Sequence, residues 1–195
     1  IFMMETKLVL LGTGTPNACP NASGPSSAVV VGDRAYLVDF GPGVVRQAAK
    51  AYQQGIDALR PDRLMIAFCT HLHTDHIVDY YSFFLSGGYT ASPGKGAVSV
   101  YGPGPAGGLP PSEVGNPNPP TVEPANPTPG IAAMTQALHR AFDPVQHLDD
   151  VAAVVTRDQS DRNRVGQAMV AVPSLTPVRR KGSIQVAKLS APTTF

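Results

Sequence analysis

The sequence predicts an α/β layered fold, because short apolar runs that end in glycine turns alternate with segments of helical spacing. The first apolar run, residues 7–11, leads into the turn GTGTP at residues 12–16, as a buried strand does where it ends in a tight loop. A second apolar run, residues 64–69, is followed at once by a histidine-rich stretch. This alternation argues against a helical bundle or a β-sandwich.

Other elements follow the same logic. Residues 28–31 and 35–38 are separated by Gly-Asp-Arg and predict a β-hairpin. Residues 44–54 carry apolar side chains at helical spacing, and Gly55 suits the end of that helix. Residues 98–101 predict a further strand, and residues 131–142 an amphipathic helix.

Proline and glycine divide the chain into three zones. Residues 102–130 contain 10 of the 20 prolines and 6 of the 19 glycines, which is incompatible with a helix or a central strand. We therefore expect a compact part over residues 1–101, an extended loop or insert over 102–130, and a helix with a poorly defined basic segment over 131–195. The 195 residues, 43% of them hydrophobic, can bury a real core.

Charge is distributed unevenly along the chain. Residues 1–150 hold 8 basic and 12 acidic groups, whereas residues 151–195 hold 7 basic and 2 acidic groups. A basic tail can contact nucleic acid, but no aromatic residues interleave with these charges, so a solvated end is the preferred interpretation. No apolar run approaches the roughly 18 residues of a membrane span, so we expect no membrane insertion.

The cysteines bear on the compartment. Cys19 and Cys69 are the only two, and they make neither a disulfide scaffold nor a CxxC metal pair. The opening residues have neither the basic nor the long apolar region of a signal peptide. The cytoplasm is the favoured localisation, with a periplasmic or secreted protein after processing left open.

The motif His71-x-His73-x-Asp75-His76 places four metal-binding side chains within six residues. The two histidines stand at alternate positions, 71 and 73, just after a strand, so their imidazoles can converge on one ion. Asp75 and His76 can turn towards a second ion. Imidazole with carboxylate suits Zn²⁺ and also accepts Mn²⁺ or Fe²⁺. Two such ions could share a hydroxide and use it for hydrolysis.

Here the sequence resembles the metallo-β-lactamase-fold metal-dependent hydrolases, because residues 71–76 match that family's histidine motif position by position. The GTGTP turn and the segment VDFGPG at residues 38–43 resemble the ribonuclease Z-like and arylsulfatase-like branches. The resemblance covers roughly residues 7–105. It implies an αβ/βα sandwich, incomplete in this chain, with the N-terminal half clear and the C-terminal half diverged or truncated.

The resemblance also implies roles for individual residues. His71 and His73 would bind the first metal of a dinuclear zinc site, and Asp75 and His76 the second, with Asp75 also acting in catalysis. Asp39 would orient the histidine loop through hydrogen bonds without binding metal; an ordinary turn-stabilising aspartate is the alternative. The substrate would be an ester: a phosphodiester such as RNA, or a small sulfate ester. A homodimer is a further implication.

The family completes its site with later residues, and here the chain departs from it. Only His139 and His147 follow the motif, the first inside the expected helix of residues 131–142 and the second after its end. We expect His139 to be a helix-surface residue and regard His147 as a weak candidate ligand. The alternative to a hydrolase is therefore a truncated, catalytically inert metal-binding fragment.

Overall fold

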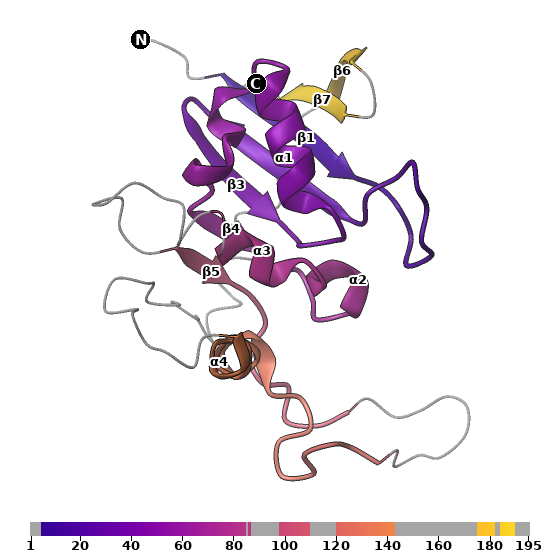
Figure 1. The fold of residues 1–195 in the computed structure, drawn as a ribbon, viewed down its shortest axis with the longest axis vertical. Helices are drawn as coiled ribbons and strands as arrows, with labels where there is room; N and C mark the ends of the chain where they lie inside the picture. The colour runs from indigo at the N-terminus through magenta and orange to yellow at the C-terminus, as the bar shows by residue number, and fades with distance from the viewer. Residues whose placement is uncertain are drawn as a thin grey trace, which may run out of the picture.

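The structure, a computed structural model, describes residues 5–84, 86, 98–109, 120–142, 175–181 and 184–189. Its strands form one seven-stranded sheet in the order β5-β4-β3-β2-β1-β7-β6. Figure 1 shows the helices α1 and α3 lying across this sheet, with α4 at the end far from β6 and β7. The α/β layered class that the sequence predicts is thereby confirmed.

The first three strands form an antiparallel meander. β1 (Thr6–Gly12) pairs with β2 (Ser26–Val31), and β2 pairs with β3 (Arg34–Val38) across the predicted hairpin. Burial alternates along β2, as the period of two in a strand requires. Gly12 ends β1 where a side chain is excluded, because a Cβ there would overlap the backbone carbonyl oxygen of Gly24.

The direction of pairing changes in the second half of the sheet. β4 (Ile66–Phe68) runs parallel to β3, and β5 (Ser99–Tyr101) runs parallel to β4. The carboxyl ends of β3 and β4 therefore meet at one edge of the sheet. In open α/β sheets ligands bind outside such carboxyl ends, so this edge is where a site is expected.

Helix α1 (Val44–Gln53) covers the meander. Its apolar positions Val44, Ala48 and Ala51 are buried, as spacings of three and four residues require. Gly43 precedes the helix with a φ of 89°, a left-handed conformation that an L side chain rarely adopts. Two 3₁₀ helices, η1 (Asp57–Leu59) and η2 (Pro61–Arg63), then lead into β4.

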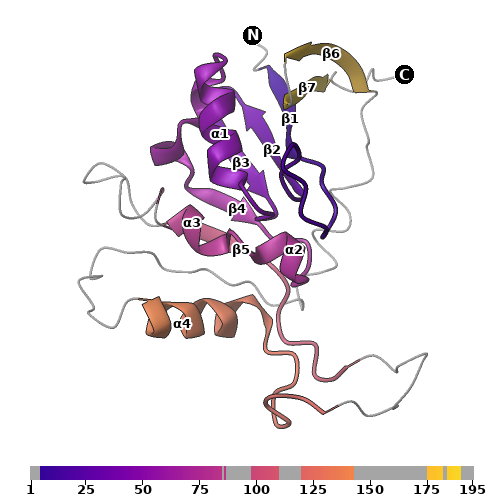
Figure 2. The same ribbon diagram turned by 45° about the vertical axis from the view of Figure 1, so that its right-hand side comes forward.

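Three further helices follow the histidine motif and the proline-rich stretch. α2 (Thr74–Ile77) contains the second half of the motif, and α3 (Tyr80–Phe84) presents Tyr80, Phe83 and Phe84 to the core. α4 (Gly130–Phe142) contacts α3 through a 2.6 Å hydrogen bond between the hydroxyls of Thr135 and Tyr80. Figure 2 shows α4 beyond α2 and α3, below the sheet.

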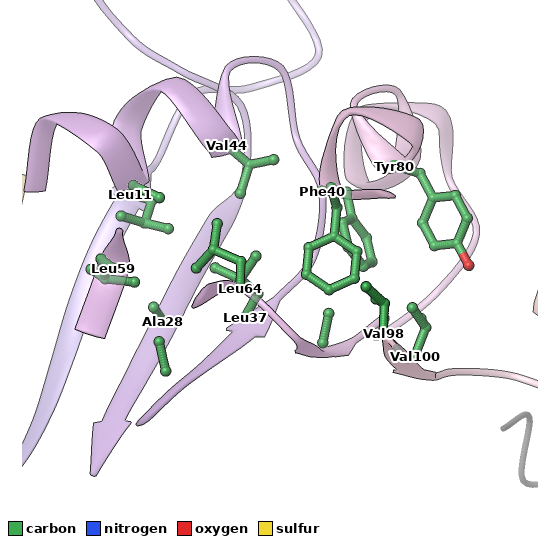
Figure 3. Packing of buried hydrophobic residues seen from close by; sticks show 14 of the residues in the cluster. Leu11, Ala28, Leu37, Phe40, Val44, Leu59, Leu64, Tyr80, Val98 and Val100 are labelled. Carbon is green, nitrogen blue, oxygen red and sulfur yellow. The ribbon is translucent and has the colours of Figure 1, made fainter. Parts of the chain in front are cut away.

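The core lies between the helices and one face of the sheet. Phe40, which follows β3, lies between the part of the core under α1 and the part under α3. The ring of Phe40 contacts Tyr80 edge-on at 4.8 Å and Phe83 at 5.6 Å between centroids. Figure 3 shows Phe40 between the residues under α1 and those under α3. The largest fully buried side chains on this face are Leu11, Leu37, Phe40, Leu59, Leu64, Tyr80, Phe83, Phe84 and Ile131.

The opposite face of the sheet is also apolar. Its positions on β1 to β4 alternate with the core positions and are mostly half-buried: Leu8, Leu10, Val29, Val31, Tyr36, Val38, Ile66 and Phe68. Phe68 is 41% exposed and stacks on Tyr101 at 5.2 Å. A sheet with apolar side chains on both faces is typical of an inner layer, as in the sandwich expected from the resemblance.

Within residues 102–109 and 120–129 the structure contains neither helix nor strand. The C-terminal zone differs from expectation, because β6 (Leu175–Lys181) and β7 (Ile184–Leu189) extend the sheet beyond β1. β7 pairs antiparallel with β1 on the side opposite β2. None of the described helices is long and apolar enough to cross a membrane.

The central strand β3 should depend strongly on its buried leucine. Replacing Leu37 (0% exposed) by alanine should lower the free energy of unfolding by about 3 kcal/mol, because it leaves a cavity in the core. The matched change at Leu109 (44% exposed) should stay within about 0.5 kcal/mol of the unsubstituted protein. Urea unfolding followed by circular dichroism measures both; equal losses would contradict this description of the core.

Candidate functional site

The histidine motif lies at the carboxyl end of β4, beside the carboxyl end of β3. Asp39 follows β3 directly, and Thr70 comes two residues after β4. Because the two strands are parallel neighbours, these residues meet: the backbone N–H of Thr70 donates to Asp39 Oδ1 at 2.7 Å. The sheet thus connects two segments that are 31 residues apart in the sequence.

Asp39 has an unusual backbone and a full set of partners. Its φ is 63°, and it is the only non-glycine residue with positive φ in the described part of the chain. Such a conformation is costly and persists where surrounding contacts hold it. The residue is 6% exposed, and its carboxylate accepts hydrogen bonds from the Thr70 hydroxyl and from His76 Nδ1 at 2.9 Å.

These hydrogen bonds determine the proton positions on two imidazoles. An ionised carboxylate can only accept, so His76 carries its proton on Nδ1 and donates it to Asp39. The single hydroxyl proton of Thr70 also goes to Asp39, 2.8 Å from Oδ2, so its oxygen must accept from His71 Nδ1 at 2.9 Å. Both rings are left with an unprotonated Nε2, the form of neutral imidazole that can bind a metal.

The four motif side chains are gathered in one place. The rings of His71 and His73 are 4.6 Å apart between centroids, and those of His71 and His76 are 4.1 Å apart. His76 Nε2 lies 3.6 Å from Asp75 Oδ2. A hollow of about 480 Å³ opens beside them, with a lining formed by Thr15, Pro16, Pro42, Leu72, His73, Thr74, Asp75 and Val78.

The loop that carries the motif is fastened to the end of β3. Phe40 donates its N–H to the His76 carbonyl at 2.7 Å and accepts from the N–H of Asp79 at 3.0 Å. The Asp79 carboxylate in turn accepts from Gly43 N–H at 2.6 Å, at the start of α1. The segment DFGPG, residues 39–43, therefore holds the histidine loop in position through backbone hydrogen bonds.

Cys69 is a buried residue that comes two positions before His71. Its thiol donates to the His71 carbonyl, with 3.1 Å between the sulfur and the oxygen. Burial, and next the negative charge of Asp39, raise the pKa of Cys69 to about 12. The thiol therefore stays protonated near neutral pH and is a poor nucleophile.

The later histidines do not complete the site within the described residues. His139 lies on α4, half-buried, with its ring 5.8 Å from Tyr81 and 5.3 Å from Phe84 between centroids. Its buried Nδ1 has no hydrogen-bond partner among the described residues. It is thus packed on α3 and is less exposed than the sequence suggested. His147 lies outside the described residues.

The donor set fits a divalent metal ion in kind but not in number. Imidazole nitrogens with a free lone pair and a nearby carboxylate are ligands for Zn²⁺. Across the described ranges, however, no three His, Cys, Asp or Glu side chains lie so that they could hold one ion. The rings of His71 and His73 meet edge-on, with 78° between their planes. The metal roles of His71, His73, Asp75 and His76 stay predictions.

Thr70 is the residue of this site that the sequence did not reveal. Its hydroxyl bonds to Asp39 and to His71, yet it appears in the sequence only as one more small polar residue before the motif. A hydroxyl-bearing residue at a strand end, directly before a histidine, was the one available signal. The presence of this threonine is informative only once Asp39 is known to bond to it, and the sequence does not show that contact.

The proton positions can be tested without metal. In chelated protein at a pH where imidazole is neutral, ¹⁵N NMR shifts should report Nδ1–H on both His71 and His76. Thr70→Val should remove this preference at His71 alone, because the hydroxyl that accepts the proton is lost. Thr70→Ser is the control and should retain it. Unchanged His71 shifts in the valine variant would contradict the hydrogen-bond assignment.

The two thiols should differ in reactivity. In folded protein at pH 8, Ellman's reagent should modify exposed Cys19 rapidly and leave Cys69 unmodified, because the Cys69 thiol is buried and protonated. Denaturation should release the second equivalent. The Cys19→Ser variant is the control and should show no fast phase. Two equivalents reacting at one rate in folded protein would contradict the burial of Cys69.

Comparison with known proteins identifies similar sequences. Ribonuclease Z of Mycobacterium avium (strain 104) is 42% identical over 73 residues, which are 37% of this chain and 24% of that protein. Ribonuclease Z of Mycobacterium sp. (strain KMS) is 36% identical over 97 residues, 50% of this chain and 32% of that protein. The chain thus spans about a quarter to a third of the length of these relatives.

Comparison with solved structures gives partial matches. The metallo-beta-lactamase fold protein YhfI from Bacillus subtilis is 20% identical with a TM-score of 0.41, over 51% of this chain and 36% of that one. Human tRNase Z, short form, is 25% identical with a TM-score of 0.41, over 50% and 34%. At the level of the family, the metallo-beta-lactamase superfamily matches residues 21–150, or 130 of the 195 residues. The chain therefore belongs to the metallo-beta-lactamase superfamily.

Proposed function

We propose that this chain carries the metal-binding histidine motif of a metal-dependent hydrolase that cleaves phosphodiester bonds in RNA. The observation that carries the proposal is the pair of imidazoles, His71 and His76, whose Nδ1 protons are held by Thr70 and Asp39. Rings that are held in this way offer Nε2 to an ion without first changing tautomer. The neighbouring hollow of about 480 Å³ gives a substrate access to the motif.

In this proposal His71 and His73 bind one ion, and Asp75 and His76 bind a second. Zn²⁺ is the ion that the donors suit best, with Mn²⁺ or Fe²⁺ as alternatives. Such an ion supplies Lewis acidity and a nucleophile at neutral pH. Because the described residues do not form a complete ligand set, the remaining ligands would come from residues outside them.

The chain's own residues have separate tasks in this scheme. Asp39 and Thr70 orient the rings and keep their Nδ1 atoms protonated. Asp75 lines the hollow, where its carboxylate can hold an ion or accept a proton from a reacting group. Pro16 and Pro42 also line the hollow and give it rigid walls next to the motif.

The mycobacterial relatives favour a phosphodiester over a sulfate ester, because both are ribonucleases by name. Sulfate-ester hydrolysis, the other branch suggested by the sequence, stays a prediction. One assay separates the two: turnover of bis(p-nitrophenyl) phosphate should exceed turnover of p-nitrophenyl sulfate in the presence of Zn²⁺ or Mn²⁺. The reverse order would favour the sulfatase branch.

A second candidate function is an inert fragment that binds metal weakly. Two observations favour it: no three donors converge within the described residues, and the chain spans about a quarter of the Mycobacterium avium relative. An incomplete ligand set binds an ion weakly and does not hold it firmly enough for hydrolysis. This candidate predicts zinc binding without metal-dependent turnover.

The decisive experiment combines metal analysis with turnover. The protein should contain zinc, and the double variant His71→Ala with His73→Ala should lose it. Turnover of bis(p-nitrophenyl) phosphate should fall by at least about 100-fold in this variant, the upper end of the loss seen when a partner of a metal ligand is removed. A chelator should have the same effect on the unsubstituted protein, and added Zn²⁺ should reverse it.

His139→Ala is the matched control, because His139 is packed against α3 away from the motif. It should keep both zinc and turnover, provided circular dichroism shows it folded. Unchanged zinc content in the double variant would rule out the motif as the metal site. Normal zinc content without turnover in the unsubstituted protein would favour the inert fragment.

A further inference from the structure

A second hollow, of about 550 Å³, shares Pro42 in its lining with the histidine hollow. It is formed by the loop after β1 and by the exposed side of α1. Its lining residues are Cys19, Pro20, Asn21, Ala22, Ser23, Pro42, Gly43, Arg46, Gln47 and Lys50. Because Pro42 borders both hollows, a substrate bound over the motif can extend directly into this one.

The charged side chains of the second hollow are both basic. Arg46 and Lys50 are four residues apart on α1, so they lie on one face of the helix, and both are exposed. Among the residues that the structure describes, neither Asp nor Glu lines this hollow. A site with two cations and no carboxylate attracts an anion, and a guanidinium matches the geometry of a phosphate group.

The walls of this hollow are held in place by hydrogen bonds. Ser23 accepts from Gly14 N–H through its carbonyl at 2.8 Å and from Gln47 Nε2 through its hydroxyl oxygen at 2.8 Å. Gly24 N–H donates to the Pro42 carbonyl at 3.0 Å. A Cβ on Gly43 would lie 2.9 Å from Ser23 Oγ, so the loop and α1 are already in close contact. The hollow is therefore present before any ligand binds.

We propose that the second hollow binds a backbone phosphate of single-stranded RNA, next to the phosphodiester that lies over the histidine motif. The proposal rests on the proposed function, since RNA is the substrate that carries a second phosphate beside the reacting one. Arg46 and Lys50 bind this phosphate and position the strand along Pro42. Contacts to backbone phosphates fix register without reading bases, so the site accepts any sequence.

The test measures RNA binding in the presence of a chelator, so that binding is recorded without cleavage. A fluorescent single-stranded oligoribonucleotide is titrated with the full chain at several salt concentrations. Each phosphate contact contributes about 0.7 to the slope of log affinity against log salt for a single strand. The double variant Arg46→Ala with Lys50→Ala should therefore lower the slope by about 1.4 and weaken binding at low salt.

Two controls separate a site from general charge. Arg34→Ala removes an exposed arginine at the start of β3 that lines neither hollow, and it should leave the slope within about 0.3 of the original, well below the 0.7 of one phosphate contact. An oligomer with uncharged methylphosphonate linkages should bind the original protein no better than RNA binds the double variant. Because Lys50 also lies in the last turn of α1, circular dichroism must confirm that each variant is folded.

The outcomes distinguish this inference from the proposed function. An unchanged slope in the double variant, or an equal loss in Arg34→Ala, overturns the phosphate site. Turnover of bis(p-nitrophenyl) phosphate, which carries a single phosphate, reports on the histidine motif alone. If the unsubstituted protein turns over bis(p-nitrophenyl) phosphate but the salt slope of the double variant is unchanged, the phosphate site is refuted and the hydrolase proposal stands. If the double variant has a lower slope but the unsubstituted protein shows no turnover, the phosphate site is supported and the hydrolase proposal is refuted.

Discussion

The site depends on one carboxylate, that of Asp39. It connects the ends of two parallel strands, because it accepts from the backbone and the hydroxyl of Thr70 after β4 while it follows β3 itself. It also accepts the Nδ1 proton of His76 and, through Thr70, decides the proton position on His71. Without this acceptor the Thr70 N–H and the His76 Nδ1–H would lose their partners.

Asp39 can adopt its strained conformation because the core holds the segment on both sides of it. Leu37 and Phe40 are fully buried, and the ring of Phe40 is packed against Tyr80 and Phe83. The backbone of Phe40 bonds to His76 and Asp79 at the same time. The hydrophobic effect that orders these aromatic residues therefore also stabilises the backbone at φ 63°, which an isolated aspartate would rarely adopt.

The same segment borders both hollows. Pro42, two residues after Phe40, lines the hollow beside the motif and also the hollow of Arg46 and Lys50. The half-buried apolar face of the sheet, with Phe68 stacked on Tyr101, lies across the sheet from the helices and belongs to the layered fold.

The sequence by itself determined the strands β1 to β5, the helices α1 and α4 and the cluster of residues 71–76, since periodicity and ligand spacing are local properties. It could name Asp39 through resemblance but not separate an orienting aspartate from an ordinary turn residue. Only the tertiary structure showed the hydrogen bonds of Asp39 to Thr70 and His76, and it added the packing of His139 on α3 and the position of β7 beside β1. Each of these depends on contacts between residues far apart in the chain, which are set by strand pairing and core packing and leave no periodic pattern in the sequence.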